Sequence, residues 1–94
     1  MVKYAFAYDV VMEIIARGPK QLGIAVQRRR KEQKLTQGEL GARMNARQAT
    51  VSKLEKGEPA TQLQTLMNSL AALGLELVVR PRTTSRLEEL EALF

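Results

Sequence analysis

The sequence predicts an all-α fold: a bundle of four to five short helices followed by one C-terminal β-strand. Apolar residues recur at helical spacing along most of the chain. Residues that favour helix starts and ends, among them Pro19, Thr36, Gly57 and Gly74, separate these apolar groups. The late stretch LELVVRP alternates instead, which is typical of a strand. With 94 residues, the chain can build one domain with a single modest core.

The composition leaves little material for catalysis or metal binding. The chain contains no Cys, which excludes disulfides and thiol nucleophiles, and no His, the commonest metal ligand and general base. We therefore expect no enzyme activity, no cofactor and no metal site. No apolar run approaches the roughly 18 residues of a membrane span, and the N-terminus lacks a signal-peptide core, so we expect a cytoplasmic protein that does not bind membranes.

Positive charge is concentrated in the body of the chain. Residues 17–56 contain eleven Lys and Arg but only three Glu, whereas residues 83–94 contain one Arg and three Glu. A basic body with an acidic tail indicates a polyanionic partner, such as nucleic acid, for the body and a different role for the tail. The alternative is a well-solvated basic surface, and charge alone leaves both open.

Residues 1–18 are predicted to form an N-terminal arm that contains a strand or a short helix. The first ten residues alternate between apolar and other types, which suits a strand. Helical spacing follows, with Asp9 available as an N-cap, in the apolar residues Val10, Val11, Ile14 and Ile15. We expect a short strand or extended arm that leads into a short helix ending at Gly18.

Residues 19–74 are predicted to form the main domain. Its first helix begins at Pro19, which suits the first helical position, and continues to about Gln33 with Leu22 and Val26 inward.

The second helix follows Thr36, whose hydroxyl caps it while Glu39 completes a capping box. Leu40 and Met44 face inward, and the chain turns at Asn45, which tolerates the left-handed conformation.

Two more helices follow in this domain. The third begins near Arg47, turns Val51 and Leu54 inward and ends at Gly57. The fourth runs from Thr61 to Leu73 and is closed by Gly74. Its apolar stripe is made of Leu63, Leu66, Met67, Leu70 and Leu73.

Residues 75–81 are predicted to be a dimerisation strand that Pro81 ends. A lone strand leaves its backbone groups unpaired, so it requires the N-terminal segment, another protein or its own copy across a two-fold axis. The residues expected to mediate dimerisation are Leu75, Leu77, Val78 and Val79. Residues 82–94 are expected to be a flexible acidic tail, since so short a helix is marginal in water.

The spacing of small and apolar residues between Gln37 and Leu54 predicts a helix-turn-helix, in which two helices cross steeply through a short turn. Gly41 stands at the crossing point, where a larger side chain has no room, and Asn45 supplies the special backbone of the turn. The residues at the required offsets are Leu40, Gly41, Met44, Asn45, Ala46, Val51 and Leu54. The plainer alternative is a pair of packed helices without a role in DNA binding.

The run RKEQKLTQGELGARMNARQATVSKLEKGE resembles the helix-turn-helix of the phage-repressor-like (Xre) regulators. Over residues 18–81 the chain is most similar to HipB-type antitoxins. That resemblance implies repression of the chain's own operon, binding of a HipA-type kinase toxin and pairing of two C-terminal strands into an intermolecular sheet. The chain departs from the family pattern at Gly41, where alanine is usual, and at Asn45, where glycine is usual.

In a helix-turn-helix, the N-terminal part of the second helix reads base edges in the major groove. Gln48 suits adenine and Ala49 a thymine methyl, while Ser52 and Lys53 suit a base or the backbone. Arg47, Lys56 and Gln37 are assigned to phosphate. The expected DNA-binding residues are therefore Gln37, Arg47, Gln48, Ala49, Thr50, Ser52, Lys53 and Lys56. For each of them alone, a plain surface role is the alternative.

The resemblance also implies a structural ion pair between Arg30 and Glu55. If the pair is buried, removing one partner should cost about 3 to 5 kcal/mol. The neighbouring Arg28, Arg29 and Lys31 are expected to remain solvated or to add to the positive field.

Two functional hypotheses follow. The first is an antitoxin-type, sequence-specific repressor that autoregulates a toxin–antitoxin operon and binds a HipA-like toxin. It would act as a homodimer on a palindromic double-stranded operator, with recognition helices about 34 to 36 Å apart. The second is a protein-interaction module that mainly sequesters a partner toxin or kinase through the acidic tail ending at Phe94, with DNA binding secondary.

Overall fold

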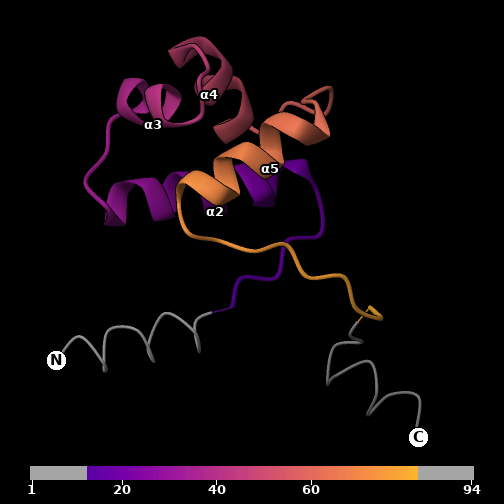
Figure 1. The fold of residues 1–94 in the computed structure, drawn as a ribbon. Helices are drawn as coiled ribbons and strands as arrows, with labels where there is room; N and C mark the ends of the chain where they lie inside the picture. The colour runs from indigo at the N-terminus through magenta and orange to yellow at the C-terminus, as the bar shows by residue number, and fades with distance from the viewer. Residues whose placement is uncertain (1–12, 83–94) are drawn as a thin grey trace, which may run out of the picture.

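The computed structural model describes residues 13–82, and its four helices confirm the predicted all-α class. The helices are α2 (Pro19–Glu32), α3 (Gln37–Arg43), α4 (Gln48–Glu55) and α5 (Leu63–Ala72). Figure 1 shows α3 and α4 together at one end of the bundle, with α2 and α5 next to them. The segments that lead away from the helices, residues 13–17 and 75–82, leave at the opposite end.

All four helices end in the same way, with a residue in the left-handed conformation. These residues are Lys34, Asn45, Gly57 and Gly74, with φ between 55° and 82°. After each helix, two backbone N–H groups donate back to carbonyls of the last turn, which is the Schellman arrangement. Asn45 was predicted to adopt this conformation and does so, whereas no pattern in the sequence indicated it for Lys34.

The core lies between the four helices. It contains all the residues predicted to face inward from the second and third helices, and Val26 from the first. The buried cluster consists of Val26, Leu35, Leu40, Met44, Val51, Leu54, Leu70 and Leu73. Leu35, in the turn after α2, joins the core although the sequence analysis assigned it no inward position.

The apolar stripe predicted for the fourth helix is wrong in part. Leu63 is 69% exposed and Met67 is 41% exposed, while Leu70 and Leu73 are buried. The fully buried Ser69 takes a core position, because its hydroxyl donates to the carbonyl of Leu66 at 2.7 Å and so satisfies its polar group. The buried face of α5 is therefore rotated away from Leu63 and Met67.

The helix predicted to end at Gly18 is not present over residues 13–17, the part of it that the structure describes. Residues 13–17 have no regular secondary structure, and Ile14 and Ile15 are exposed. Helical spacing alone is a weak signal here, because so short a helix needs a surface to pack against. The strand or arm predicted for the first residues lies outside the described residues.

The strand predicted for residues 75–81 is also not present, since residues 75–82 form no regular secondary structure in this single chain. A strand needs a neighbour to pair with its backbone, and within residues 13–82 no segment pairs with this one. Leu75 packs against the core, but Val79 is 91% exposed. Arg80 reaches Glu13 at 3.5 Å, which connects the two segments at this end of the molecule. The predicted acidic tail lies outside the described residues.

None of the helices between residues 13 and 82 is long and apolar enough to cross a membrane.

Candidate nucleic-acid interface

The predicted helix-turn-helix corresponds to α3, the turn after it and α4. At the start of α3, the backbone N–H of Glu39 donates to the Thr36 hydroxyl at 3.0 Å, and the backbone N–H of Thr36 donates to the Glu39 carboxylate at 2.9 Å. The predicted capping box is thereby confirmed. The pKa of Glu39 lies below its ordinary value. The main cause is the hydrogen bond from the Thr36 backbone, and the second is the Thr36 side chain.

The turn between the helices leaves no space at Gly41. A Cβ atom on this residue would lie 2.7 Å from the backbone oxygen of Ala46, well inside van der Waals contact. The Ala46 N–H donates to the Gly41 carbonyl at 2.7 Å, so the two backbones touch directly. Gly41 therefore stands where a larger side chain has no room, as predicted from the sequence.

A second close approach joins α2 to the end of α4. A Cβ atom on Gly23 would lie 2.5 Å from the carbonyl oxygens of both Leu54 and Glu55. This contact was not predicted from the sequence. Its available signal was a glycine in the interior of a predicted helix, which is unfavourable there unless close packing requires it.

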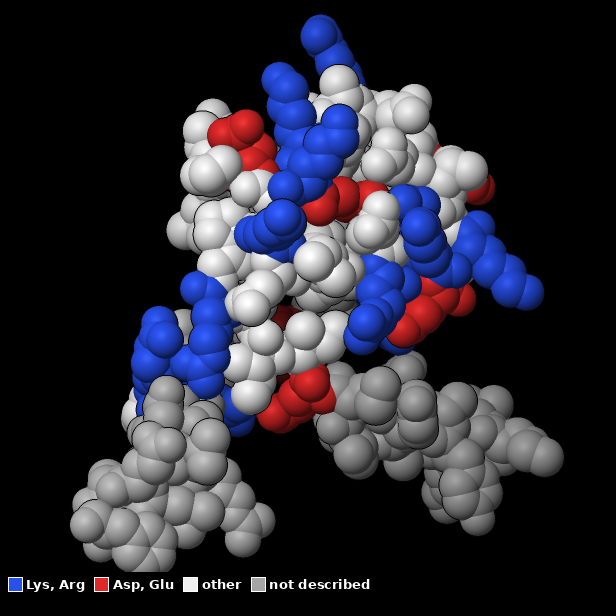
Figure 2. Space-filling view, turned by 180° about the vertical axis from the view of Figure 1, so that it is seen from behind, with Lys and Arg blue, Asp and Glu red and all other residues white. Residues whose placement is uncertain are grey.

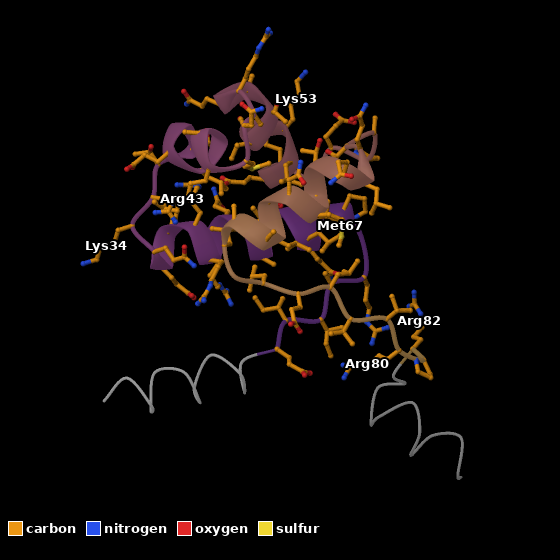
Figure 3. All side chains as sticks on the ribbon, viewed as in Figure 1. Lys34, Arg43, Lys53, Met67, Arg80 and Arg82 are labelled. Atoms are coloured by element: carbon orange, nitrogen blue, oxygen red, sulfur yellow. The ribbon has the colours of Figure 1, made fainter. Side chains whose placement is uncertain are left out.

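The two sides of α4 differ sharply. Val51, Leu54 and Glu55 are buried against the bundle. Of the predicted DNA-binding residues on this helix, Gln48, Ala49 and Lys53 are exposed, and Thr50 and Ser52 are half-buried. Figure 3 shows Lys53 projecting outward from the end of the molecule that α3 and α4 form. The polar side of α4 is thus a surface and not part of the core.

The first turn of α4 is open to solvent. Arg47 is the N-cap residue, but its side chain makes no capping hydrogen bond, and it is exposed. Its carbonyl accepts from the N–H groups of Thr50 and Val51, which leaves those of Gln48 and Ala49 without an intrahelical partner. A basic residue here also lies at the positive end of the helix dipole, which is unfavourable for the fold.

The structure brings Arg30, Glu55 and Gln37 together from three different helices. Arg30 donates to both carboxylate oxygens of Glu55, from Nε at 2.6 Å and from Nη2 at 3.0 Å, and Nη1 donates to the Leu35 carbonyl at 2.8 Å. The side chains of Arg30 and Glu55 are only 9% and 2% exposed. The hydrogen bond with Glu55 raises the pKa of Arg30, so this buried guanidinium stays charged.

Gln37 was assigned to phosphate, and in this structure its side chain also has an internal partner. Its Nε2 donates to Glu55 Oε1 at 3.1 Å, while the side chain remains half-exposed at the first position of α3. This contact was not predicted from the sequence, because Gln37 and Glu55 lie 18 residues apart.

Arg29 corrects an expectation. It is not simply solvated: its Nε donates to the Leu73 carbonyl at 3.2 Å, and Gln33 Nε2 donates to the same oxygen at 2.8 Å. The end of α2 is therefore attached to the end of α5, where Leu73 presents a carbonyl that the helix leaves unpaired. Arg28 and Lys31 are exposed, as expected.

Basic side chains are prominent on this surface. Figure 2 shows Lys and Arg over the upper end of the molecule, at the level of α3 and α4 in Figure 1, and further down both sides, with fewer acidic side chains among them. The exposed basic residues of these helices and of the turns next to them are Lys34, Arg43, Arg47, Lys53 and Lys56. Such a concentration attracts polyanions.

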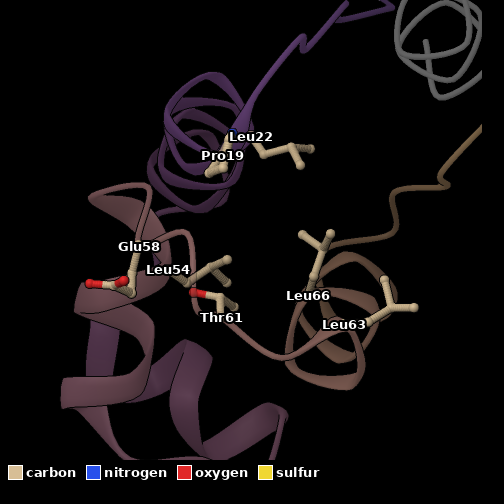
Figure 4. A pocket seen from close by; sticks show the side chains of 7 residues that line it. All are labelled: Pro19, Leu22, Leu54, Glu58, Thr61, Leu63 and Leu66. Atoms are coloured by element: carbon tan, nitrogen blue, oxygen red, sulfur yellow. The ribbon is translucent and has the colours of Figure 1, made fainter.

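The structure also contains an apolar groove of about 160 Å³ between α2, α5 and the end of α4. Leu22 and Leu66 point towards each other across it (Figure 4). Its lining residues are Pro19, Leu22, Leu54, Glu58, Thr61, Leu63 and Leu66. Within residues 13–82, no group of three or more acidic residues could hold a metal ion.

Comparison with known proteins places this geometry in a family. Residues 15–81 match the model of a family described as a helix-turn-helix domain. A solved HipB–O4 20mer complex contains a chain 29% identical to this one, with a TM-score of 0.69 over 77% of this chain and 100% of that one. A solved HipA–HipB–O2–O3 complex matches at 29% identity and a TM-score of 0.66, over 77% of this chain and 99% of that one. A comparison with curated proteins finds no match.

Proposed function

Because the chain belongs to the helix-turn-helix domain family, we propose that it is a sequence-specific, DNA-binding repressor of the antitoxin type. In this proposal it represses its own toxin–antitoxin operon and binds a HipA-like toxin. Support comes from its similarity to HipB, whose solved structures include complexes with a 20mer and with HipA.

One observation carries the DNA-binding part. The polar side chains of α4 lie at the surface, whereas the apolar side of the same helix is buried. Among the described residues, the side chains of Gln48, Thr50 and Ser52 have no hydrogen-bond partner, so their polar groups are free for a ligand. A helix of this kind fits the major groove of DNA.

The roles of individual residues follow from their positions. Gln48 and Ala49, in the first turn of α4, are proposed to read base edges, with Thr50, Ser52 and Lys53 adding base or backbone contacts. Arg47, Lys56 and Gln37 are proposed to bind phosphate and so to set the register of the helix.

A pair of substitutions tests this assignment. A duplex is first selected from a random DNA library with the wild-type protein, and binding is then measured by fluorescence anisotropy at several salt concentrations. Gln48→Ala should lose about 1 to 3 kcal/mol of discrimination at one base pair per half-site. Lys56→Ala should weaken binding to every sequence. It should also reduce the slope of log affinity against log salt concentration by about one. Equal losses for Gln48→Ala on selected and random DNA would exclude base reading by this residue.

We further propose that the protein binds DNA as a homodimer through residues 75–81. Leu77, Val78 and Val79 are exposed apolar residues in a segment whose backbone has no ladder partner within the described chain. A second copy would pair with this backbone and cover the apolar side chains. Two recognition helices would then read a palindromic site. A single helix contacts too few base pairs to be specific.

A proline in this segment tests the dimer. Val78→Pro removes a backbone donor and should give monomers by light scattering, with loss of binding to the palindromic duplex. Val78→Thr retains the N–H group and the β-branch, and it should remain dimeric. A Val78→Pro protein that is still a dimer would contradict the proposed pairing.

The toxin-binding part is tested by the neighbouring reading frame. If this frame encodes a kinase-like protein, that protein and this chain should form a stable complex when they are produced together and separated by size.

A further inference from the structure

The side chain of Gln37 is attached to the buried ion pair. Glu55 receives hydrogen bonds from Arg30 at both oxygens, and the same Oε1 that accepts from Arg30 Nη2 also accepts from Gln37 Nε2. Arg30 is itself held by its bond to the Leu35 carbonyl. A half-exposed side chain at the protein surface is thus fixed by a carboxylate that has almost no freedom to move.

We propose that Glu55 is a positioning residue for Gln37, so that the buried ion pair contributes to DNA affinity as well as to folding. This inference rests on the proposed function, in which Gln37 binds phosphate. Glu55 itself touches no DNA, because it lies on the buried side of α4.

The physical reason lies in the two ends of a carboxamide. Its nitrogen donates hydrogen bonds and its oxygen accepts them, and the two ends have nearly the same shape. A carboxylate accepts only, so Glu55 selects the orientation with the Gln37 nitrogen towards it. One N–H then bonds Glu55, and the second remains available to donate to a phosphate oxygen. Without Glu55, a flipped carboxamide could present its oxygen to the phosphate, which repels it.

Prior orientation also reduces the entropy lost on binding. A free glutamine side chain is among those that lose most rotamer freedom when they are ordered. Since Gln37 is already ordered by Glu55 in the free protein, less is lost when DNA binds. Glu55 is moreover the last residue of α4 and Gln37 the first of α3, so the bond joins the proposed phosphate contact to the helix that reads bases.

Replacing both members of the ion pair separates positioning from stability. Arg30→Met together with Glu55→Met exchanges the charges for apolar side chains of similar volume, a change that often leaves a fold as stable as before. It also removes the acceptor that holds Gln37. The experiment measures the affinity of the wild type, the double-Met variant, Gln37→Ala and the triple variant for the duplex selected by the wild type, and it measures the stability of each by urea unfolding.

We expect the double-Met variant to bind about three- to tenfold more weakly than the wild type at matched stability, as Gln37→Ala does. In the double-Met background, Gln37→Ala should change the affinity less than about twofold. Wild-type affinity in a stable double-Met variant overturns the inference, and so does an equal effect of Gln37→Ala in both backgrounds. A wild type without salt-dependent DNA binding removes the proposed function itself, which is a different result.

A measurement on the wild type keeps the inference testable if the double-Met variant does not fold. In the DNA-free protein, the side-chain NH₂ group of Gln37 should be markedly more ordered by NMR relaxation than that of Gln62, which is exposed and forms no side-chain cap. Equal mobility of the two groups would show that Glu55 does not hold Gln37.

Discussion

The two helices of the helix-turn-helix begin in opposite ways. At the start of α3, Thr36 and Glu39 satisfy each other's backbone N–H groups in a complete capping box. At the start of α4, the N-cap residue is Arg47, which forms no cap and adds a positive charge at the positive end of the helix. One start therefore stabilises the fold, and the other leaves donors and positive charge at the surface.

This difference separates positions that build the scaffold from positions that are open to a ligand. Ser, Thr, Asp and Asn are the residues that cap helices well, and α4 has none of them at its start. Free N–H groups and a basic side chain are unfavourable for an isolated helix, but both favour a polyanion such as DNA. The start of α4 thus agrees with the proposed function. We expect that a substitution there can change the stability of the protein separately from its affinity for DNA.

The largest effect expected between Thr36 and Arg47 concerns the turn that joins the two helices. Gly41→Ala should destabilise the protein by about 1 to 3 kcal/mol, because the new Cβ would lie 2.7 Å from the Ala46 oxygen. Gly38→Ala in the same helix is the control, since its Cβ would have only the Thr36 hydroxyl nearby, at 3.8 Å. Gly38→Ala should be neutral or stabilising by a few tenths of a kcal/mol. Urea unfolding measures both, and equal stabilities would mean that the turn opens easily to admit the alanine that is usual in the phage-repressor-like family.

A smaller loss is expected at the capped start of α3. Thr36→Ala should cost about 1 kcal/mol and lower the midpoint of thermal unfolding by about 4 to 8 °C, while Thr36→Ser should retain most of the cap.

The capping box also predicts a pH dependence. Because the pKa of Glu39 is lowered in the folded state, its contribution is complete above the ordinary Glu pKa of about 4.3 and is lost as the pH falls through the lowered value. The wild type should therefore lose more stability on acidification from about pH 5 than Glu39→Gln, which can keep the hydrogen bond to the Thr36 backbone but carries no titratable group. Parallel curves for the two proteins would show that the box does not carry this effect.

The sequence predicted the helix-turn-helix well because its signals are local. The capping residues Thr36 and Glu39 are three positions apart, and Asn45 marks its own turn. Each of these features needs only residues within one or two turns of helix, so each is visible without the rest of the fold. The free polar residues of α4 followed from the same local pattern, as the side opposite Val51 and Leu54.

The features that the sequence did not reveal depend on distant neighbours. Gly23 is required by the carbonyls of Leu54 and Glu55, more than thirty residues later. Lys34 adopts a left-handed conformation that an isolated Lys avoids, because the end of α2 and the buried Leu35 require it. For the same reason, alternation alone could not produce a strand at residues 75–81, since a strand needs a partner that this single chain does not provide.

A small change in stability gives the sharpest test of the difference between the two helix starts. Arg47→Asn introduces a good N-cap at the start of α4, so it should stabilise the fold by about 0.5 to 1 kcal/mol in urea unfolding. The same substitution removes a positive charge from the proposed interface, so DNA binding should weaken. The slope of log affinity against log salt concentration should fall by about one. Arg43→Asn is the matched control, because it removes an exposed charge from the last turn of α3, where a cation is favourable. Arg43→Asn should therefore not stabilise the fold. If Arg47→Asn lowers stability and affinity together, the start of α4 is part of the scaffold after all, and the distinction between the two helix starts is wrong.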